Sequence, residues 1–182
     1  FSGDGRQVAF ASDRSGNQQL WVANLDGSAL RSVTELQDAT VSLGSWSPDG
    51  RRLAFDATMG DKTQIYVVPV GGGPLKRVTD GTATEIDPEW SRDGRWIYFA
   101  SNRTGRPEVW KMPSAGGDLI QITKGGGFAA FESSDGRYLY YAKGVESDGV
   151  WKVAVSGGEE AEIIGFPKAG FWGYWALVDT GI

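Results

Sequence analysis

The residues of this chain whose types and spacing could do chemistry are four aspartates, each followed by Gly-Arg: Asp4, Asp49, Asp93 and Asp135. Carboxylates that converge in a ring could bind a divalent cation, because Ca²⁺ and Mg²⁺ prefer oxygen ligands. In the competing interpretation each Asp accepts hydrogen bonds from nearby backbone amides and each Gly supplies a positive φ, as in a turn. The same residues recur along the chain, whereas a single site would occur once. We therefore predict turns, and no metal-binding or cofactor-binding residue.

Two pairs of neighbouring carboxylates are candidates for acid–base chemistry. Residues two apart in a strand lie on the same face, so Asp87 and Glu89 could point together toward a central channel. Glu159 and Glu160 are interpreted as a polar hairpin end. A general acid–base pair also needs a pocket and suitable pKa values, for which these patterns give no indication. We predict no catalytic residue and no enzymatic activity in this chain.

The composition excludes several kinds of chemistry. Among the 182 residues there is no Cys and no His, which excludes disulfides, Cys nucleophiles and every Ser-His-Asp arrangement. The formal net charge is −5, and no cluster of Lys and Arg stands out, so we expect this segment to bind no nucleic acid. No stretch approaches the roughly 18 apolar residues of a transmembrane helix, and no membrane span is predicted.

An internal repeat positions the aspartates. The motif Trp46-Ser47-Pro48-Asp49-Gly50-Arg51 has counterparts at 1–6, 90–95 and 131–137, and a fragment at 175–181. The aspartates at 4, 49, 93, 135 and 179 are 45, 44, 42 and 44 residues apart, steps in the size range of β-propeller blades. Other landmarks keep step with them: Trp21, Tyr66, Trp110 and Trp151, then Thr34, Thr79 and Thr123. This spacing predicts repeats over about 1–45, 46–89, 90–131 and 132–175, and the start of a fifth over 176–182.

Each repeat is predicted to consist of strands, and no segment shows a sustained helical period. β-branched and aromatic residues follow each Asp-Gly turn and surround each aromatic landmark. Apolar residues on both strand faces are typical of a blade that packs between two neighbours. The strand before each turn is expected over 40–46, 85–90, 128–132 and 172–177. We predict an all-β protein, a β-propeller of four-stranded antiparallel blades with four repeats in this chain.

Loops are the expected place for binding, because loops on a rigid scaffold commonly carry it. The segments 12–16, 60–62 and 101–105 lie between the second and third strands and could form a charged rim, although solvated turns are favoured. In the fourth repeat the corresponding loop is 143–149, which lacks the Ser-x-Arg-x-Gly pattern. The aromatic cluster of Phe171, Trp172, Tyr174 and Trp175 is interpreted as core between blades. No binding residue is assigned.

The motifs resemble a known repeat family. Trp46-Ser47-Pro48-Asp49-Gly50, Asp87-Pro88-Glu89-Trp90-Ser91 and the segment 100–105 are similar to the TolB-like β-propeller repeat, a bacterial, WD-repeat-like propeller. The resemblance covers essentially the whole chain. Gly3 and Arg92 depart from it where the pattern has Pro. It implies a protein or peptide partner and a periplasmic or otherwise extracytoplasmic location.

Three functions are compatible with this resemblance. The segments 126–133 and 149–153 resemble the C-terminal propellers of CadC-type winged-helix regulators and of some bacterial Ser/Thr kinases, which implies a non-enzymatic interaction or sensory scaffold. The second is the substrate-gating propeller of a serine peptidase of the prolyl-oligopeptidase or tricorn type, with the catalytic domain outside this segment. The third is a TolB-type envelope protein. The first is our leading hypothesis.

The chain starts and stops within a motif, so we expect a piece of a longer protein. Its open edges allow three outcomes, because unpaired edge strands invite association. The segment could close on itself as four blades, or two copies could form an eight-bladed ring as a homo-oligomer. Alternatively, the remainder of a larger propeller lies outside the segment.

Overall fold

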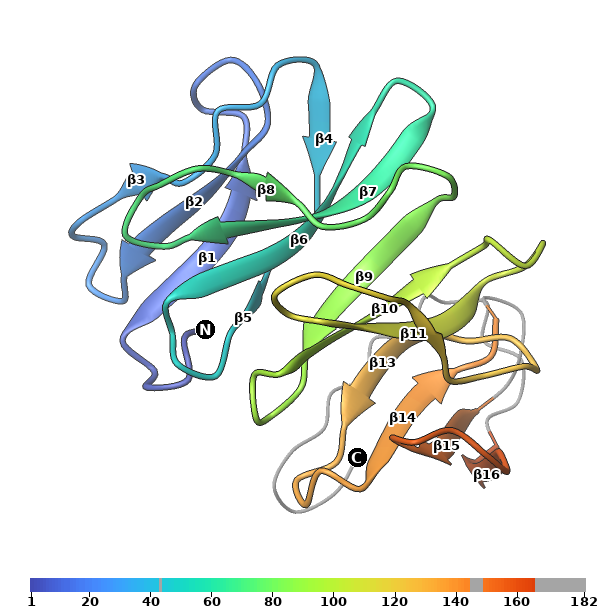
Figure 1. Cartoon of the computed structure of the whole chain (residues 1–182). Helices are drawn as coiled ribbons and strands as arrows, with labels where there is room; N and C mark the ends of the chain where they lie inside the picture. Colours follow the sequence, from blue (N-terminus) through green and yellow to red (C-terminus); the bar gives the residue numbers. More distant parts are fainter. Residues whose placement is uncertain (43, 145–148, 166–182) are drawn as a thin grey trace. The chain divides into compact units, whose positions relative to one another are not determined.

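The computed structural model describes residues 1–42, 44–144 and 149–165, and the regular elements in these residues are all β-strands (Figure 1). The prediction of an all-β protein is confirmed. Within the described part, no helix has the length and apolar character needed to cross a membrane. The chain divides into two compact units, Phe1–Trp90 and Ser91–Ile182. The strand expected over 172–177, the aromatic cluster at 171–175 and the start of a fifth repeat lie outside the described residues.

The first unit contains two antiparallel sheets made of consecutive strands (Figure 1). One has the order β1-β2-β3, and the other has the order β4-β6-β7-β8, with β5 also paired to β6. Strand β9 ends the unit and lies against β6 and β7. The bounds are β1 Gln7–Ser12, β2 Gln19–Asn24, β3 Arg31–Ser32, β4 Ala39–Val41, β5 Ser45–Trp46, β6 Arg52–Met59, β7 Lys62–Pro69, β8 Lys76–Arg77 and β9 Glu85–Trp90.

The second unit repeats this arrangement. Strands β10, β11 and β12 pair antiparallel in sequence order, and the next sheet has the order β13-β14-β15-β16. Strand β13 lies against β10 and β11, so successive blades of this unit pack on one another. The bounds are β10 Trp96–Ser101, β11 Glu108–Pro113, β12 Ile120–Gln121, β13 Phe128–Glu132, β14 Tyr138–Ala142, β15 Val150–Ala154 and β16 Ala161–Ile164.

Two of the strands that precede an Asp-Gly-Arg turn carry a bulge that the sequence did not predict. The segment 40–46, expected as one strand, is two short strands, because its pairing with β6 shifts by one residue between Val41↔Ala57 and Ser45↔Ala54. In β13 the pairing shifts in the same way, between Phe128↔Ala142 and Phe131↔Tyr140. Ala129 within that bulge has a φ of 49°. An extra residue on one strand bends it, so the bulge sets the direction of this strand.

Each unit has a core supplied by both faces of its strands, as the apolar pattern predicted. In the first unit Phe55 is fully buried and stacks on Tyr66, with ring centroids 5.8 Å apart. In the second unit Tyr98, Leu139 and Tyr141 are buried in one cluster with residues from β11, β13 and β15. Aromatic rings of this size bury much apolar surface per residue and hold the sheets together.

We expect two glycines of the second unit to differ sharply in their tolerance of alanine. Gly136 has a φ of 69° with nothing within 4 Å of an added Cβ, so G136A should cost about 1–2 kcal/mol for the left-handed conformation alone. Gly126 has a φ of 94°, and its Cβ would lie 2.5 Å from the Lys143 carbonyl oxygen. G126A should therefore cost roughly 1–3 kcal/mol more. Urea denaturation measures both, and equal midpoints would contradict this account.

Candidate functional site

The four Asp-Gly-Arg turns are built alike, and each carboxylate is bound within its own turn. The Ser two residues earlier donates its hydroxyl to the Asp Oδ1 at 2.5–2.7 Å. The amide of the following Arg donates to the same oxygen at 2.9–3.1 Å. The four turn glycines have φ values of 67–71°, so the predicted turn chemistry is confirmed. Across residues 1–42, 44–144 and 149–165, no three potential metal-ligating side chains gather.

The serine of the motif is the part of the turn that sequence reasoning missed. Its hydroxyl also accepts the backbone amide five residues later, at 2.9–3.0 Å, and Ser47 and Ser91 are each 1% exposed. The serine hydroxyl thus joins the turn to the next strand, and its bond is the main reason why the pKa of each turn Asp is lowered. In the fourth repeat Ser133 has this role, so Glu132 stands where the earlier repeats have Phe or Trp.

In two of the three loops proposed as a charged rim, 12–16 and 101–105, the arginine turns back onto its own blade. The Arg14 guanidinium lies 5.1 Å from the centre of the Trp21 ring and donates to Ser12 Oγ. Arg103 lies over the Trp110 ring in the same way, also at 5.1 Å. Such cation–π contacts occupy the guanidinium face that a partner would otherwise meet. The fourth loop differs, with Lys143 Nζ 3.6 Å from the centre of the Trp151 ring, and residues 145–148 lie outside the described part.

The members of both carboxylate pairs differ in their surroundings. Asp87 is exposed and has a φ of 54°. This backbone conformation interrupts the alternation of strand faces, on which the expectation that Asp87 and Glu89 share a face depended. Its amide donates to Oδ1 of Asp56 at 3.0 Å. Asp56 is 8% exposed, and burial raises its pKa although bonds from Ser42 and from the Asp87 amide oppose that rise. Sequence reasoning missed Asp56, which stands where the other repeats have Ala.

In the first two blades, which contain β1–β3 and β4–β8, a buried Gln side chain anchors the segment that follows the outermost strand. Gln19 accepts the Thr34 hydroxyl at 2.7 Å and donates to the Leu36 carbonyl at 2.6 Å. Gln64 binds in the same way, accepting from Thr79 at 3.2 Å and donating to the carbonyl of Ala83 at 2.7 Å. We call this Gln–Thr pair the edge clamp. The fixed separation of 15 residues between its two members is a signal that could have identified it from the sequence.

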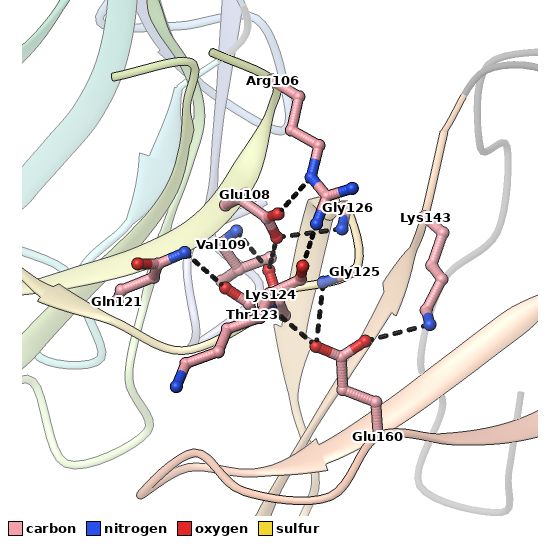
Figure 2. A network of polar contacts seen from close by, with 10 residues as sticks. All are labelled: Arg106, Glu108, Val109, Gln121, Thr123, Lys124, Gly125, Gly126, Lys143 and Glu160. Carbon is pink, nitrogen blue, oxygen red and sulfur yellow. Dashed lines mark hydrogen bonds and ion pairs between the residues drawn. The ribbon is translucent and has the colours of Figure 1, made fainter. Parts of the chain in front are cut away.

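The third blade has Glu108 at the clamp position, which changes the charge of the site (Figure 2). The Glu108 side chain is 2% exposed, and its Oε2 accepts the Thr123 hydroxyl at 2.6 Å and the Gly126 amide at 3.0 Å. A carboxylate cannot donate a hydrogen bond, so Arg106 donates to a backbone carbonyl in place of the Gln amide. The Arg106 Nε donates to Glu108 Oε1 at 2.7 Å, and the Arg106 guanidinium also donates to the Lys124 carbonyl.

The same network extends to Glu160 on the next blade (Figure 2). Its Oε1 accepts the amides of Lys124 at 2.7 Å and Gly125 at 3.3 Å, and its Oε2 forms an ion pair with Lys143 Nζ at 3.0 Å. Burial would raise the pKa of Glu160, but the Lys124 amide, Lys143 and Tyr141 outweigh it and keep that pKa below its usual value. Glu160 is thus a bound carboxylate, whereas Glu159 beside it is exposed, as expected of a hairpin end.

A second polar feature surrounds Glu132. Its carboxylate accepts the Arg92 amide and the Tyr98 hydroxyl, the latter at 3.1 Å. Arg92 also donates through Nε to the Ser133 carbonyl at 2.9 Å. An open depression of about 340 Å³ lies here, lined by Arg92, Asp93, Glu132, Ser134, Asp135 and Gly136. The polar side chains around this depression thus bind turn hydroxyls, a tyrosine hydroxyl and backbone groups.

Comparison with known proteins places these features in a family. Residues 1–164 match a family model described as the TolB beta propeller domain. A putative TolB from Agrobacterium tumefaciens is 25% identical over 89% of this chain and 62% of its own, with a TM-score of 0.78. TolB from Acinetobacter baumannii is 21% identical over 90% of this chain and 42% of its own, with a TM-score of 0.75. The prediction of TolB-like propeller repeats is confirmed.

Propellers of peptidases share the fold. A puromycin-hydrolyzing peptidase from Mycobacterium tuberculosis is 18% identical over 88% of this chain and 28% of its own, with a TM-score of 0.72. The chain spans less than two thirds of the length of each of these three structures. A search of curated proteins finds no match.

We expect Ser133→Ala to raise the pKa of Asp135 from about 2 toward 3.8, because the Ser133 hydroxyl is the main group that lowers it. A lowered carboxyl pKa stabilises the fold above pH 3.8, and this stabilisation is lost as the pH falls toward 2. The variant should lose this acid-range dependence, as measured by NMR titration of the carboxyl carbon. Ser134→Ala is the control, since Ser134 is exposed. An unchanged Asp135 pKa in S133A would contradict the assignment.

A double-mutant cycle tests the charged clamp. Arg106→Ala should destabilise the second unit by about 1–3 kcal/mol, because Glu108 would stay buried without its charged donor. Glu108→Gln restores the amide of the first two blades and should cost little. R106A should therefore cost less than about 1 kcal/mol in the E108Q background. Chemical denaturation of the four proteins measures the coupling, and additive effects would refute it.

Proposed function

The chain belongs to the TolB β-propeller domain family, and from this premise we propose that it is a non-enzymatic domain that binds a protein or peptide partner. In this proposal it is the interaction or sensory scaffold of a larger bacterial protein, as in CadC-type regulators or bacterial Ser/Thr kinases. Its location is then periplasmic or otherwise extracytoplasmic. Self-association through open propeller edges is part of the same proposal, since unpaired strands favour it.

The observation that carries the proposal is the internal use of the polar groups that recur in the blades. The turn aspartates accept from Ser hydroxyls and Arg amides, the loop arginines lie on Trp rings, and the clamp side chains bind their own blade. A general acid, base or nucleophile must be able to reach a substrate. Groups that bond within a blade serve the scaffold and are not placed to act on a substrate, which supports a non-enzymatic role.

The peptidase propeller is the second candidate. The similarity to the puromycin-hydrolyzing peptidase favours it, at the level of the fold. In that case this segment would direct substrates toward a catalytic domain outside it, because the chain contains neither His nor a Gly-x-Ser-x-Gly motif. A TolB-type envelope protein is the third candidate, favoured by the match of residues 1–164.

The proposal predicts saturable partner binding without turnover. The purified chain is used to capture partners from a bacterial extract, and the affinity of each purified pair is measured by titration calorimetry. Leu53→Asp is the control, since Leu53 is fully buried and an unpaired core charge should unfold its unit and abolish binding. The same chain is assayed with peptidyl and aminoacyl nitroanilides.

Reversible binding with no turnover supports the interaction domain. Hydrolysis that copurifies with the folded chain would refute it, and so would a chain that binds nothing reversibly. A catalytic domain whose kcat/KM for large but not small substrates changes when this chain is added would establish the peptidase alternative instead.

A further inference from the structure

The segment 124–126 surrounds a carboxylate with donors (Figure 2). Two successive amides, of Lys124 and Gly125, point at one oxygen of Glu160, and the Lys143 ammonium binds the other. Successive backbone amides that converge in this way form an anion-binding concavity, and an added ammonium makes it stronger. The arrangement is therefore a complete receptor for one carboxylate, and the chain fills it with its own.

The glycines of this segment leave room for the two charged side chains. A Cβ on Gly125 would lie 2.8 Å from Glu160 Oε2 and 3.0 Å from Lys143 Nζ, in the space where the carboxylate and the ammonium meet. The left-handed φ of Gly126 lets the chain turn directly after the two donating amides. The first two blades have no Gly-rich run at this place, since Glu35 and Asp80 follow their clamp threonines.

Tyr141, which is fully buried, is electrostatically coupled to the same carboxylate. Burial and Glu160 together raise the pKa of Tyr141, and the Tyr141 hydroxyl in turn helps to keep the pKa of Glu160 low. The hydroxyl therefore favours a charged carboxylate at this place.

Glu160 lies between a glycine turn and an exposed edge strand. The turn before it contains Gly157 and Gly158, with φ values of 82° and 126°. The strand after it, β16, is exposed over residues 161–163, and its pairing with β15 shifts register between Val150 and Trp151. Edges with few buried contacts open at low free-energy cost.

We propose that Lys124, Gly125 and Lys143 form a binding site for the carboxylate of a peptide or protein, and that Glu160 occupies this site until the ligand replaces it. The carboxylate can come from a chain terminus or from an acidic side chain, since both present the same two oxygens. The peptide origin of the ligand rests on the proposed function, whereas the receptor itself does not. Free carboxylates therefore test the receptor even if partner capture fails.

The test is a titration of the full chain with small carboxylates, followed through the amide shifts of Lys124 and Gly125 by NMR. N-acetylglycine supplies a terminal carboxylate, the α-methylamide of N-acetylaspartate supplies a side-chain carboxylate, and N-acetylglycinamide is the neutral control. Glu160→Ala should bind at least about tenfold more tightly than the wild type, because the internal competitor is gone. Glu159→Ala, which removes the neighbouring exposed carboxylate, should behave like the wild type.

Adding Lys143→Ala to E160A should abolish most of the gain. Whichever of the two carboxylates binds more tightly identifies the source that the site prefers. No saturable shift in folded E160A would overturn the proposal, and so would equal binding of the neutral amide. If E160A loses its amide dispersion, Glu160→Gln replaces it, because Gln keeps an acceptor for the amides but gives up the ion pair. E160Q should then show a smaller gain, and the lack of any gain would be decisive against the site.

Discussion

The outermost strands of the first three blades are too short to be held in place by their backbone hydrogen bonds alone. A buried side chain with several hydrogen bonds supplies the remaining attachment. Strands β3, β8 and β12 have two residues each and two register pairs each. The clamp residues Gln19, Gln64 and Glu108 are at most 5% exposed, and a buried polar group without a partner costs roughly 1–3 kcal/mol. The fourth blade has Gly149 and Ile164 at the two clamp positions, and its outer strand β16 is four residues long. A longer ladder thus replaces the clamp.

The charge of the third clamp explains why the polar network of Figure 2 forms in the second unit. Glu108 needs a cationic donor where Gln needs none, and Arg106 supplies it while binding the Lys124 carbonyl. With that carbonyl and the Gly126 amide bound on one side of the segment, the Lys124 and Gly125 amides face Glu160 on the other. One substitution in a repeated position therefore organises a site that the first two blades do not have.

The repeat, the strands and the turns could be predicted because they depend on residue type at a fixed spacing. The hydrogen bonds of the turn serines and of the clamp residues were not predicted, although these residues recur at a spacing as regular as that of the turns. A hydroxyl or amide that bonds inside a blade cannot be distinguished in the sequence from any other polar residue. The bulges could not be predicted, because they depend on strand register and not on residue type. The contact of Lys124 with Glu160 joins residues 36 apart in different blades. No local pattern indicates that Glu160 is bound while Glu159 is exposed.

Glu160, a group of the same chain, fills the carboxylate site and binds donors that would otherwise lack an anion. Two converging amides and an ammonium left without an anion would lose their charge-assisted hydrogen bonds, which would weaken the fold at this place. Glu160 satisfies them, so the blade is stable without a ligand. Exchange for another carboxylate then replaces like with like, and its free energy depends on small differences in the geometry of these contacts. Such a site selects between ligands through contacts with the remainder of the ligand, because the contacts of the incoming carboxylate and those of Glu160 contribute nearly equal free energies. In a scaffold whose repeated polar groups are committed to folding, selective binding has to come from positions where one blade departs from the others.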